Sequence, residues 1–230
     1  MELFSREDLM PAAAARLRRV HTVLDIGPGI RPQTLVSGFL HVCVEPYRPY
    51  AELLSREHPD YVVLNCTWSQ ALKLLPSDSV DTVVLLDVIE HLEKPEGARL
   101  LEQTIRLARS QVVVYTPLGF MPQGENEPKD AWGMDGTDWQ VHRSGWSPED
   151  FPDWDILACE RYHLQDAYGR QLEEPHGAFF AICERGVTVD PETQNELLAS
   201  LALKNRTYEQ STSWRVTRPL RAIGRILGRG

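Results

Sequence analysis

The sequence lacks a hydrophobic run of the roughly 18 residues that a membrane-spanning helix needs. Its first eight residues include Glu2, Glu7 and Asp8, whereas a signal peptide begins with basic residues and continues into a long apolar stretch. We therefore expect neither a membrane span nor a secretory leader. The expected location is the cytoplasm.

Cysteine is scarce, with four residues in a chain of 230. None of them has the CxxC or Cys/His spacing that is typical of zinc sites. Each lies in an apolar or strand-like context, which favours free thiols in a reducing compartment. The sequence therefore predicts no disulfide framework and no metal site. The four cysteines are Cys43, Cys66, Cys159 and Cys183.

Basic residues are fewer than acidic ones, 24 against 33, and the formal net charge of the chain is -9. This balance excludes a general duplex nucleic-acid binder, so we expect no nucleic-acid partner. From Lys204 onward, however, there are seven basic residues and one acidic residue, which gives this tail +6 and the preceding 203 residues -15. We expect a main domain over residues 1–203 and a basic extension over residues 204–230.

Short β-branched runs alternate with helical patterns, as in a parallel sheet covered by helices on both faces. Two later runs lie close enough in sequence to form an antiparallel pair. The expected fold is an α/β, doubly wound sheet of seven strands. The strand runs are Thr22–Ile26, Leu40–Glu45, Tyr61–Asn65, Asp81–Asp87, Gln111–Thr116, Trp154–Cys159 and Gly177–Cys183, and the helical patterns are Pro11–Val20, Pro49–Glu57 and Pro95–Arg109.

The most specific motif is VLDIGPG at residues 23–29, where a buried strand carries an acid and then turns through two glycines. A nicotinamide site needs a third glycine at the position of Pro32, and the GxxxxGK[ST] phosphate loop is absent. An acid before the glycines, Asp25, suits a cationic ligand better than a pyrophosphate. Glu45, at the end of the next strand, is placed to accept hydrogen bonds from two ribose hydroxyls. S-adenosylmethionine is such a cationic nucleoside without phosphates.

These residues, together with DTVVLLDVIEHL at residues 81–92, resemble the successive motifs of class I S-adenosylmethionine-dependent methyltransferases. The resemblance covers roughly residues 22–116. The family often has a third glycine where this chain has Arg31, and a Gly-Asp pair where it has Asn65 and Cys66. The resemblance implies a Rossmann-like fold whose last strand is antiparallel, and S-adenosyl-L-methionine as cofactor. The implied cofactor-binding residues are Asp25, Gly27, Pro28, Gly29, Glu45, Cys66, Thr67 and Asp87.

Two histidines are candidates for a general base. An alcohol acceptor is a weak nucleophile until its proton is removed, and a positioned base contributes about 10²–10⁴-fold. His91 follows the fourth strand, at the expected methyl end of the cofactor, and alternatively packs on the sheet as a helix-terminal residue. His142 lies in a long irregular segment, where a lid over the acceptor is expected.

That irregular segment, residues 117–150, is the expected acceptor-site insertion. It contains Trp132, Trp139 and Trp146 among several acidic residues, and aromatic faces with carboxylates are suited to binding sugars. Alternatively, the tryptophans anchor a long loop to the domain. The stretch from Ser147 to Asp150 has the pattern of a helix N-cap and first turn.

The basic extension carries an amphipathic pattern after Pro219, with apolar residues on one face and arginines on the other. Such a helix binds an anionic membrane surface or the acidic surface of a partner or dimer mate. Alternatively, it is a solvated terminus. The run SWRVTRPLRAIGRIL at residues 213–227 resembles the tails of many bacterial glycosyltransferases and methyltransferases of surface-polysaccharide gene clusters.

The combined expectation is a methyltransferase that O-methylates a lipid-linked or nucleotide-linked sugar in surface-glycan assembly of the lipopolysaccharide or O-antigen type. Its tail would contact a glycosyltransferase or the inner face of the membrane. One alternative is a methyltransferase for a small non-sugar metabolite. Another is a non-catalytic scaffold that binds glycan-assembly enzymes. The sequence leaves homo-oligomerisation and the choice between oxygen and nitrogen as acceptor atom open.

Overall fold

The structure is a computed structural model that describes residues 1–123 and 127–186. These residues belong to one compact unit. The expected domain boundary at residue 203 and the basic extension lie outside the described residues. Across the described ranges, every helix is too short or too polar to cross a lipid bilayer.

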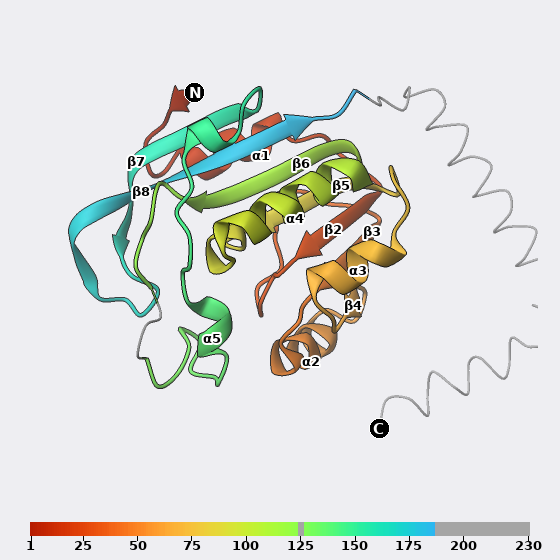
Figure 1. Ribbon diagram of the computed structural model, residues 1–230, viewed down its shortest axis with the longest axis horizontal. Coiled ribbons are helices and arrows are strands. Elements are labelled where there is room, and N and C mark those ends of the chain that lie inside the picture. Colours follow the sequence, from red (N-terminus) through yellow and green to blue (C-terminus); the bar gives the residue numbers. More distant parts are fainter. Residues whose placement is uncertain (124–126, 187–230) are drawn as a thin grey trace, which may run out of the picture. The chain divides into compact units, whose positions relative to one another are not determined.

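A single twisted sheet with helices packed against it forms the body of the protein (Figure 1). Its strand order is β1-β7-β8-β6-β5-β2-β3-β4. All pairings among strands β2 to β6 are parallel, whereas β8 is antiparallel to both β6 and β7. The predicted α/β doubly wound class and the antiparallel last strand are therefore confirmed. The strands are β1 Glu2–Leu3, β2 Thr22–Ile26, β3 Leu40–Val44, β4 Val62–Leu64, β5 Val80–Leu86, β6 Ala108–Pro117, β7 Asp155–Gln165 and β8 Gln171–Glu184.

The strand number is one more than the predicted seven. The additional strand is β1, in which Glu2 and Leu3 pair in parallel with Leu157 and Ala158 of β7. Two residues are too few to display the alternating pattern by which strands are detected in a sequence. The prediction therefore missed β1, which adds an edge to the sheet without changing the order of the other seven.

In the part of the chain that the structure describes, five helices and two 3-10 turns connect the strands: α1 Leu9–Arg16, α2 Arg48–Glu57, α3 Trp68–Leu74, η1 Ile89–His91, α4 Lys94–Leu107, α5 Thr137–Gln140 and η2 Pro148–Asp150. Helix α1 begins two residues before Pro11, where the sequence predicted its start. Proline is accommodated there because the first four backbone N–H groups of a helix have no intrahelical partner. At η2, where the sequence predicted a helix cap and first turn, the Asp150 carboxylate accepts a hydrogen bond of 2.9 Å from the Ser147 N–H.

Two hydrophobic clusters lie on opposite faces of the sheet, because successive strand residues point to opposite sides. In β2, Leu24 belongs to the cluster that includes Leu100 and Leu107 of α4. The adjacent Val23 belongs to the cluster that includes Leu9 of α1. This arrangement explains the nearly continuous apolar strands of the sequence, since both faces are covered.

The chain reverses its direction of travel across the sheet between β2 and β5. Strands β3 and β4 follow β2 toward one edge, whereas β5 and β6 lead toward the other. In open α/β sheets, the crevice outside the carboxyl ends of the strands at such a switch point is the usual ligand site. The fold therefore directs attention to the turns that follow Ile26, Val44 and Leu86.

Candidate functional site

A cavity of about 620 Å³ lies at this switch point. Its lining combines the turn after β2, the end of β3, the start of α3, the turn after β5 and the segment around α5. The polar and aromatic residues in its wall are Glu45, Tyr50, Thr67, Trp68, Ser69, Asp87, His91, Glu93, Glu96, Trp132, Asp138, Trp139, Gln140 and Arg143. The volume is within the range of about 300–1,000 Å³ typical of small-molecule sites.

In the turn after β2, the backbone of two glycines without side chains lines the cavity. Gly27 and Gly29 adopt positive φ angles of 67° and 59°, a region that glycine enters without steric cost. Asp25, which is 2% exposed, holds the loop beyond them, because its Oδ2 accepts a hydrogen bond of 2.9 Å from the Gln33 backbone. The same oxygen lies 3.3 Å from Nε2 of His41. Asp25 therefore acts on the loop and is not part of the cavity wall.

The Glu45 carboxylate lies beside this turn. Its Oε2 accepts a hydrogen bond of 3.0 Å from the Gly29 N–H, and its Oε1 accepts one of 2.8 Å from the Tyr47 N–H. Burial raises the pKa of Glu45 to about 7, although both backbone donors oppose the shift. Each oxygen accepts one hydrogen bond in the structure, so each retains capacity for another donor from a ligand.

Another part of the cavity wall comes from residues 130–140, which α2 holds in place. Asp130 is the centre of this attachment: its carboxylate accepts hydrogen bonds from the Tyr50 hydroxyl and from the backbone of Trp132, Met134 and Gly136. The Trp132 ring meets Tyr50 edge-on, with 4.9 Å between ring centroids. The irregular segment is thus a defined part of the site.

The turn after β5 is strained and acidic. Asp87 has a φ of 52°, which costs a non-glycine residue about 1–2 kcal/mol. Removal of water by the surrounding protein raises the pKa of Asp87 to about 6. Burial, together with the charge of Asp87, raises the pKa of Glu90 well above its usual range. Backbone strain combined with perturbed carboxyl groups is typical of functional sites.

His91 and His142 meet at the same turn, although 50 residues separate them in the sequence. Their ring centroids are 4.8 Å apart. Burial and the neighbouring His142 lower the pKa of His91 to about 3, and burial also lowers the pKa of His142. Both rings are therefore neutral at pH 7, but a group with a pKa of about 3 holds an abstracted proton weakly.

Comparison with known proteins identifies the fold. No protein-family model matches the sequence, and no curated protein sequence is significantly similar to it. Among solved structures, a protein of Bacillus halodurans C-125 that is named as a methyltransferase aligns with a TM-score of 0.50 and 12% identity, over 78% of this chain and 98% of that one. The described chain has the class I methyltransferase fold.

Two further structures with methyltransferase names align less well. A SAM-dependent methyltransferase from Archaeoglobus fulgidus gives a TM-score of 0.47 with 18% identity, over 76% of this chain and 94% of that one. The bifunctional kinase-methyltransferase WbdD gives 0.42 with 16% identity, over 76% of this chain and 37% of that one. At such identities the similarity concerns the fold alone.

Within the methyltransferase fold, eight of the residues singled out in the sequence reach the cavity: Gly27, Gly29, Glu45, Thr67, Asp87, His91, Trp132 and Trp139. The others lie outside its lining: Asp25 behind the glycine turn, Pro28 between the two glycines, Cys66 before α3, His142 behind His91, and Trp146 in the core. Thr67 also caps α3 through a reciprocal pair of hydrogen bonds with Gln70.

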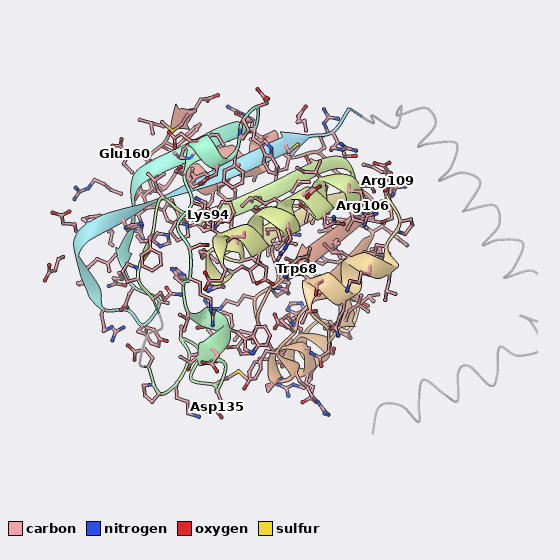
Figure 2. The ribbon with its side chains drawn as sticks, viewed as in Figure 1. Trp68, Lys94, Arg106, Arg109, Asp135 and Glu160 are labelled. Carbon is pink, nitrogen blue, oxygen red and sulfur yellow. The ribbon has the colours of Figure 1, made fainter. Side chains whose placement is uncertain are left out.

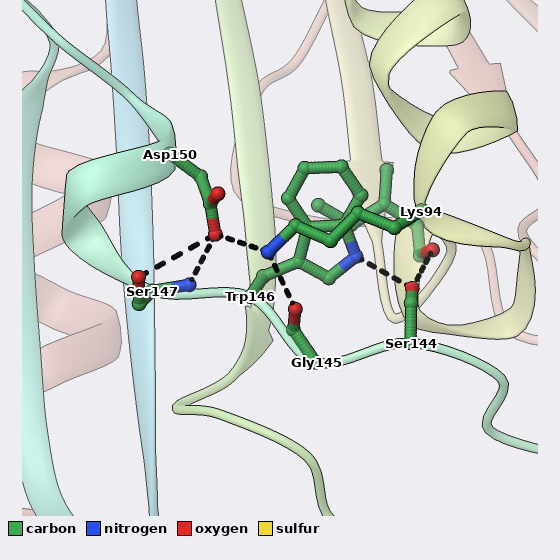
Figure 3. Close-up of polar contacts among 7 residues, drawn as sticks. Lys94, Ser144, Gly145, Trp146, Ser147 and Asp150 are labelled. Carbon is green, nitrogen blue, oxygen red and sulfur yellow. Dashed lines mark hydrogen bonds and ion pairs between the residues drawn. The ribbon is translucent and has the colours of Figure 1, made fainter.

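Trp146 is an anchor of the irregular segment rather than part of the cavity wall. It is 2% exposed and belongs to the hydrophobic cluster on the α4 face of the sheet. Its Nε1 donates a hydrogen bond of 2.9 Å to Ser144, and the Lys94 ammonium lies 4.8 Å from its ring centroid (Figure 3). For this tryptophan, the structure agrees with the alternative interpretation that tryptophans anchor the loop.

Several lining residues were not recognised from the sequence. Trp68 begins α3 (Figure 2), and its helix could have been detected from the Thr67-x-x-Gln70 capping-box pattern. Tyr50, Gln140 and Arg143 also line the cavity. No local pattern marks these three, because their positions follow from packing between α2 and the irregular segment.

Proposed function

We propose that this protein transfers a methyl group from S-adenosylmethionine to a hydroxyl group of a sugar. The observation that carries the proposal is the cavity at the switch point of the sheet, where the Glu45 carboxylate and the backbone of Gly29 form one wall. Four further acidic residues line the cavity, Asp87, Glu93, Glu96 and Asp138, against one arginine, Arg143. Such a site suits a cationic nucleoside better than a phosphorylated cofactor.

The proposed cofactor position follows from these groups. Glu45 would accept hydrogen bonds from the two ribose hydroxyls, as its remaining lone pairs allow. The Gly27 and Gly29 backbone would pass under the methionine portion, and Asp87 would lie near its ammonium group. Thr67, at the start of α3, would lie near the adenine.

The proposed acceptor position is the mouth of the cavity beside α5. Trp139 is 46% exposed and lies in the cavity wall next to the exposed Asp138. An exposed indole can stack on the apolar face of a sugar ring while the carboxylate accepts hydrogen bonds from its hydroxyls. This combination supports a carbohydrate acceptor, and the tail resemblance to surface-polysaccharide enzymes supports a glycan in that setting.

The chemistry is an in-line displacement. The acceptor hydroxyl would lose its proton to water, and its oxygen would form a bond to the methyl carbon while the bond between carbon and sulfur breaks. The electron pair of that bond remains on sulfur, so the positive sulfonium becomes the neutral thioether of S-adenosylhomocysteine. Alignment of the two reactants is a large part of the acceleration that a protein can supply.

The basic extension, residues 204–230, is proposed as a separate attachment segment on the basis of its sequence. Its role would be contact with an anionic membrane surface or with a glycosyltransferase. Deletion of residues 211–230 should then abolish co-sedimentation with anionic vesicles or a glycosyltransferase while leaving cofactor affinity unchanged. Unchanged co-sedimentation would assign the attachment to another surface.

Calorimetric titration with S-adenosylmethionine and S-adenosylhomocysteine tests the cofactor site. Wild-type protein should bind both, and Glu45→Gln should weaken binding at least about 10-fold through loss of one charged hydrogen-bond acceptor. Glu52→Gln, an exposed glutamate on α2, is the matched control. Absence of binding by the wild type would refute the proposal.

Mass spectrometry of reactions with sugar acceptors tests the transfer step. A gain of one methyl group on a nucleotide-linked or lipid-linked sugar is the expected result. Transfer only to metabolites other than sugars would show that the proposed acceptor class is wrong. Cofactor binding without transfer to any acceptor would leave a binding protein with a methyltransferase fold.

A further inference from the structure

The irregular segment docks onto η1 through its backbone. The N–H groups of Arg143 and Ser144 both donate to the carbonyl oxygen of Glu90, over 2.7 and 3.1 Å. The Ser144 hydroxyl donates to the carbonyl of Ile89 over 3.2 Å. These bonds hold residues 142–144 against the turn after β5 and place the His142 ring beside His91.

Three residues with metal-ligating side chains, one carboxylate and two imidazoles, converge at this point. Glu90, His91 and His142 each offer one ligand atom, and the three atoms lie within 4.8 Å of one another. Glu90 is 1% exposed; its Oε2 accepts a hydrogen bond of 3.1 Å from Thr116, whereas its Oε1 is buried without a hydrogen-bond partner. A buried carboxylate oxygen without a donor is costly unless a cation or proton compensates it.

The two imidazoles are oriented in the manner of metal ligands. Nδ1 of His91 lies 3.2 Å from the Val141 carbonyl, and Nδ1 of His142 lies 2.6 Å from the Met121 carbonyl. A carbonyl only accepts, so each Nδ1 carries the proton, and in the neutral ring Nε2 keeps its lone pair. Ligating histidines usually donate their other ring N–H to a carbonyl or carboxylate in this way.

The cluster also has a surplus of acceptors over donors. The Asp87 carboxyl acts electrostatically on Glu90, and within residues 1–123 and 127–186 neither acid takes part in an ion pair with lysine or arginine. Arg143 is close, but its guanidinium donates to backbone carbonyls of His91, Asp138 and Val141. Two carboxyl groups beside two neutral imidazoles form a set that a divalent cation would satisfy.

We propose that Glu90, His91 and His142 bind a divalent transition-metal ion at the wall of the cavity. One carboxylate with two imidazoles is a donor set for Zn²⁺, Mn²⁺, Fe²⁺ or Co²⁺, whereas Mg²⁺ prefers oxygen ligands alone. Because His91 lines the cavity, the ion would have coordination positions open to a ligand there. The site would thus be of the open kind, with three protein ligands.

The catalytic role of the ion rests on the proposed methyl transfer, whereas its binding does not. An ion held by Glu90, His91 and His142 would lower the pKa of an acceptor hydroxyl bound to it, and the hydroxyl proton would pass to water. The oxygen then attacks the methyl carbon as described above. In this arrangement the two histidines act as ligands, and their Nδ1–H groups remain donated to the carbonyls of Val141 and Met121.

Metal binding is measured on the full chain after treatment with a chelator and without cofactor. Calorimetric titration with Co²⁺, Mn²⁺ and Zn²⁺ should give one equivalent bound, with at least about 10-fold weaker binding of Mg²⁺. Glu90→Gln and His142→Gln should each weaken binding more than about 100-fold, since even an outer-shell substitution costs about 10–100-fold. His58→Gln, at the end of α2, is the control that should leave affinity unchanged.

Spectroscopy of the Co²⁺-loaded protein distinguishes this site from a second cluster that could bind the same ion. Asp25, His41 and Cys43 form a second cluster of ligand types, fully buried beside β2 and β3. Co²⁺ at that site would show a thiolate charge-transfer band, which is absent when the ligands are nitrogen and oxygen. Pulsed EPR of the Mn²⁺-loaded wild type should show coupling to two imidazole nitrogens, and this result stands even where a variant fails to fold.

The inference is refuted if the wild type binds no metal, if both variants bind it normally, or if the thiolate band appears. A proton shared between Asp87 and Glu90 would then satisfy the acids. Titration with S-adenosylhomocysteine is read separately, so failure of the metal site and failure of the proposed function give different results.

Discussion

The Trp132 indole lies directly on Gly29. A Cβ atom added to Gly29 would fall 2.2 Å from Cη2 of Trp132, so no side chain fits between them. Gly29 also adopts a positive φ and donates its N–H to Glu45. Gly29 therefore contacts both the Glu45 carboxylate, through its N–H, and the Trp132 indole of the irregular segment.

Gly29→Ala should therefore destabilise the protein by about 2–4 kcal/mol, because backbone strain and overpacking against Trp132 add together. Gly133→Ala is the matched control: its φ of 76° imposes a similar strain, but a Cβ there meets no other atom within 4 Å. The control should lose only about 1–2 kcal/mol. Urea denaturation measures both variants, and equal losses would contradict the contact.

Cofactor affinity should increase with pH through the pKa of Glu45, which is about 7. The carboxylate accepts hydrogen bonds from ribose hydroxyls better than the protonated acid does. Calorimetry with S-adenosylhomocysteine at a series of pH values should show this rise. In Glu45→Gln, the remaining rise in affinity should be smaller and should occur near the pKa of Asp87, which is about 6. An identical pH profile in the variant would remove Glu45 from the cofactor site.

The same pKa predicts a pH effect on folding. Since the folded-state pKa of Glu45 lies above the usual value of 4.5, its contribution to stability is fully present below about pH 4.5 and declines as the pH rises through about 7. Wild type should therefore lose more stability than Glu45→Gln between about pH 5 and pH 8. Urea denaturation at both pH values measures the difference, and parallel curves would contradict it.

Trp139→Ala should raise the KM for a sugar acceptor about 10-fold, which corresponds to about 1.4 kcal/mol of lost contact. Affinity for S-adenosylhomocysteine should remain within about twofold, because the indole is 46% exposed and is assigned to the acceptor rather than to the cofactor. Steady-state kinetics and calorimetry separate the two effects. A loss confined to cofactor affinity would move Trp139 out of the proposed acceptor position.

Trp146→Ala should destabilise the protein by about 3–5 kcal/mol, the usual cost of truncating a buried aromatic residue. Trp139→Ala, with its exposed side chain, should change the free energy of unfolding by less than about 0.5 kcal/mol. Thermal or urea denaturation distinguishes them. Similar losses in both would mean that Trp146 is not the anchor of its segment (Figure 3).

Most of the fold could be predicted from the sequence, and so could eight residues of the cavity lining. Glu45 and the two glycines follow directly from strand ends, and strand ends are visible as breaks in β-branched runs. The start of α1 was predicted two residues late because Pro11 was placed at the first helical position, although it occupies the third. The proximity of Glu90, His91 and His142 was not recognised, because His142 lies about fifty residues from the other two in the sequence.

The sequence by itself determined most of the strands and helices and their order along the chain, because these features arise from local periodicity and turn chemistry. Only the tertiary structure decided that Trp146 is buried, that Trp132 covers Gly29, and that His142 meets Glu90 and His91. These contacts depend on backbone hydrogen bonds between an irregular segment and η1, about fifty residues apart in the chain. Backbone N–H and C=O groups are common to nearly all residues, so the residue types in the sequence do not predict which of these groups will pair.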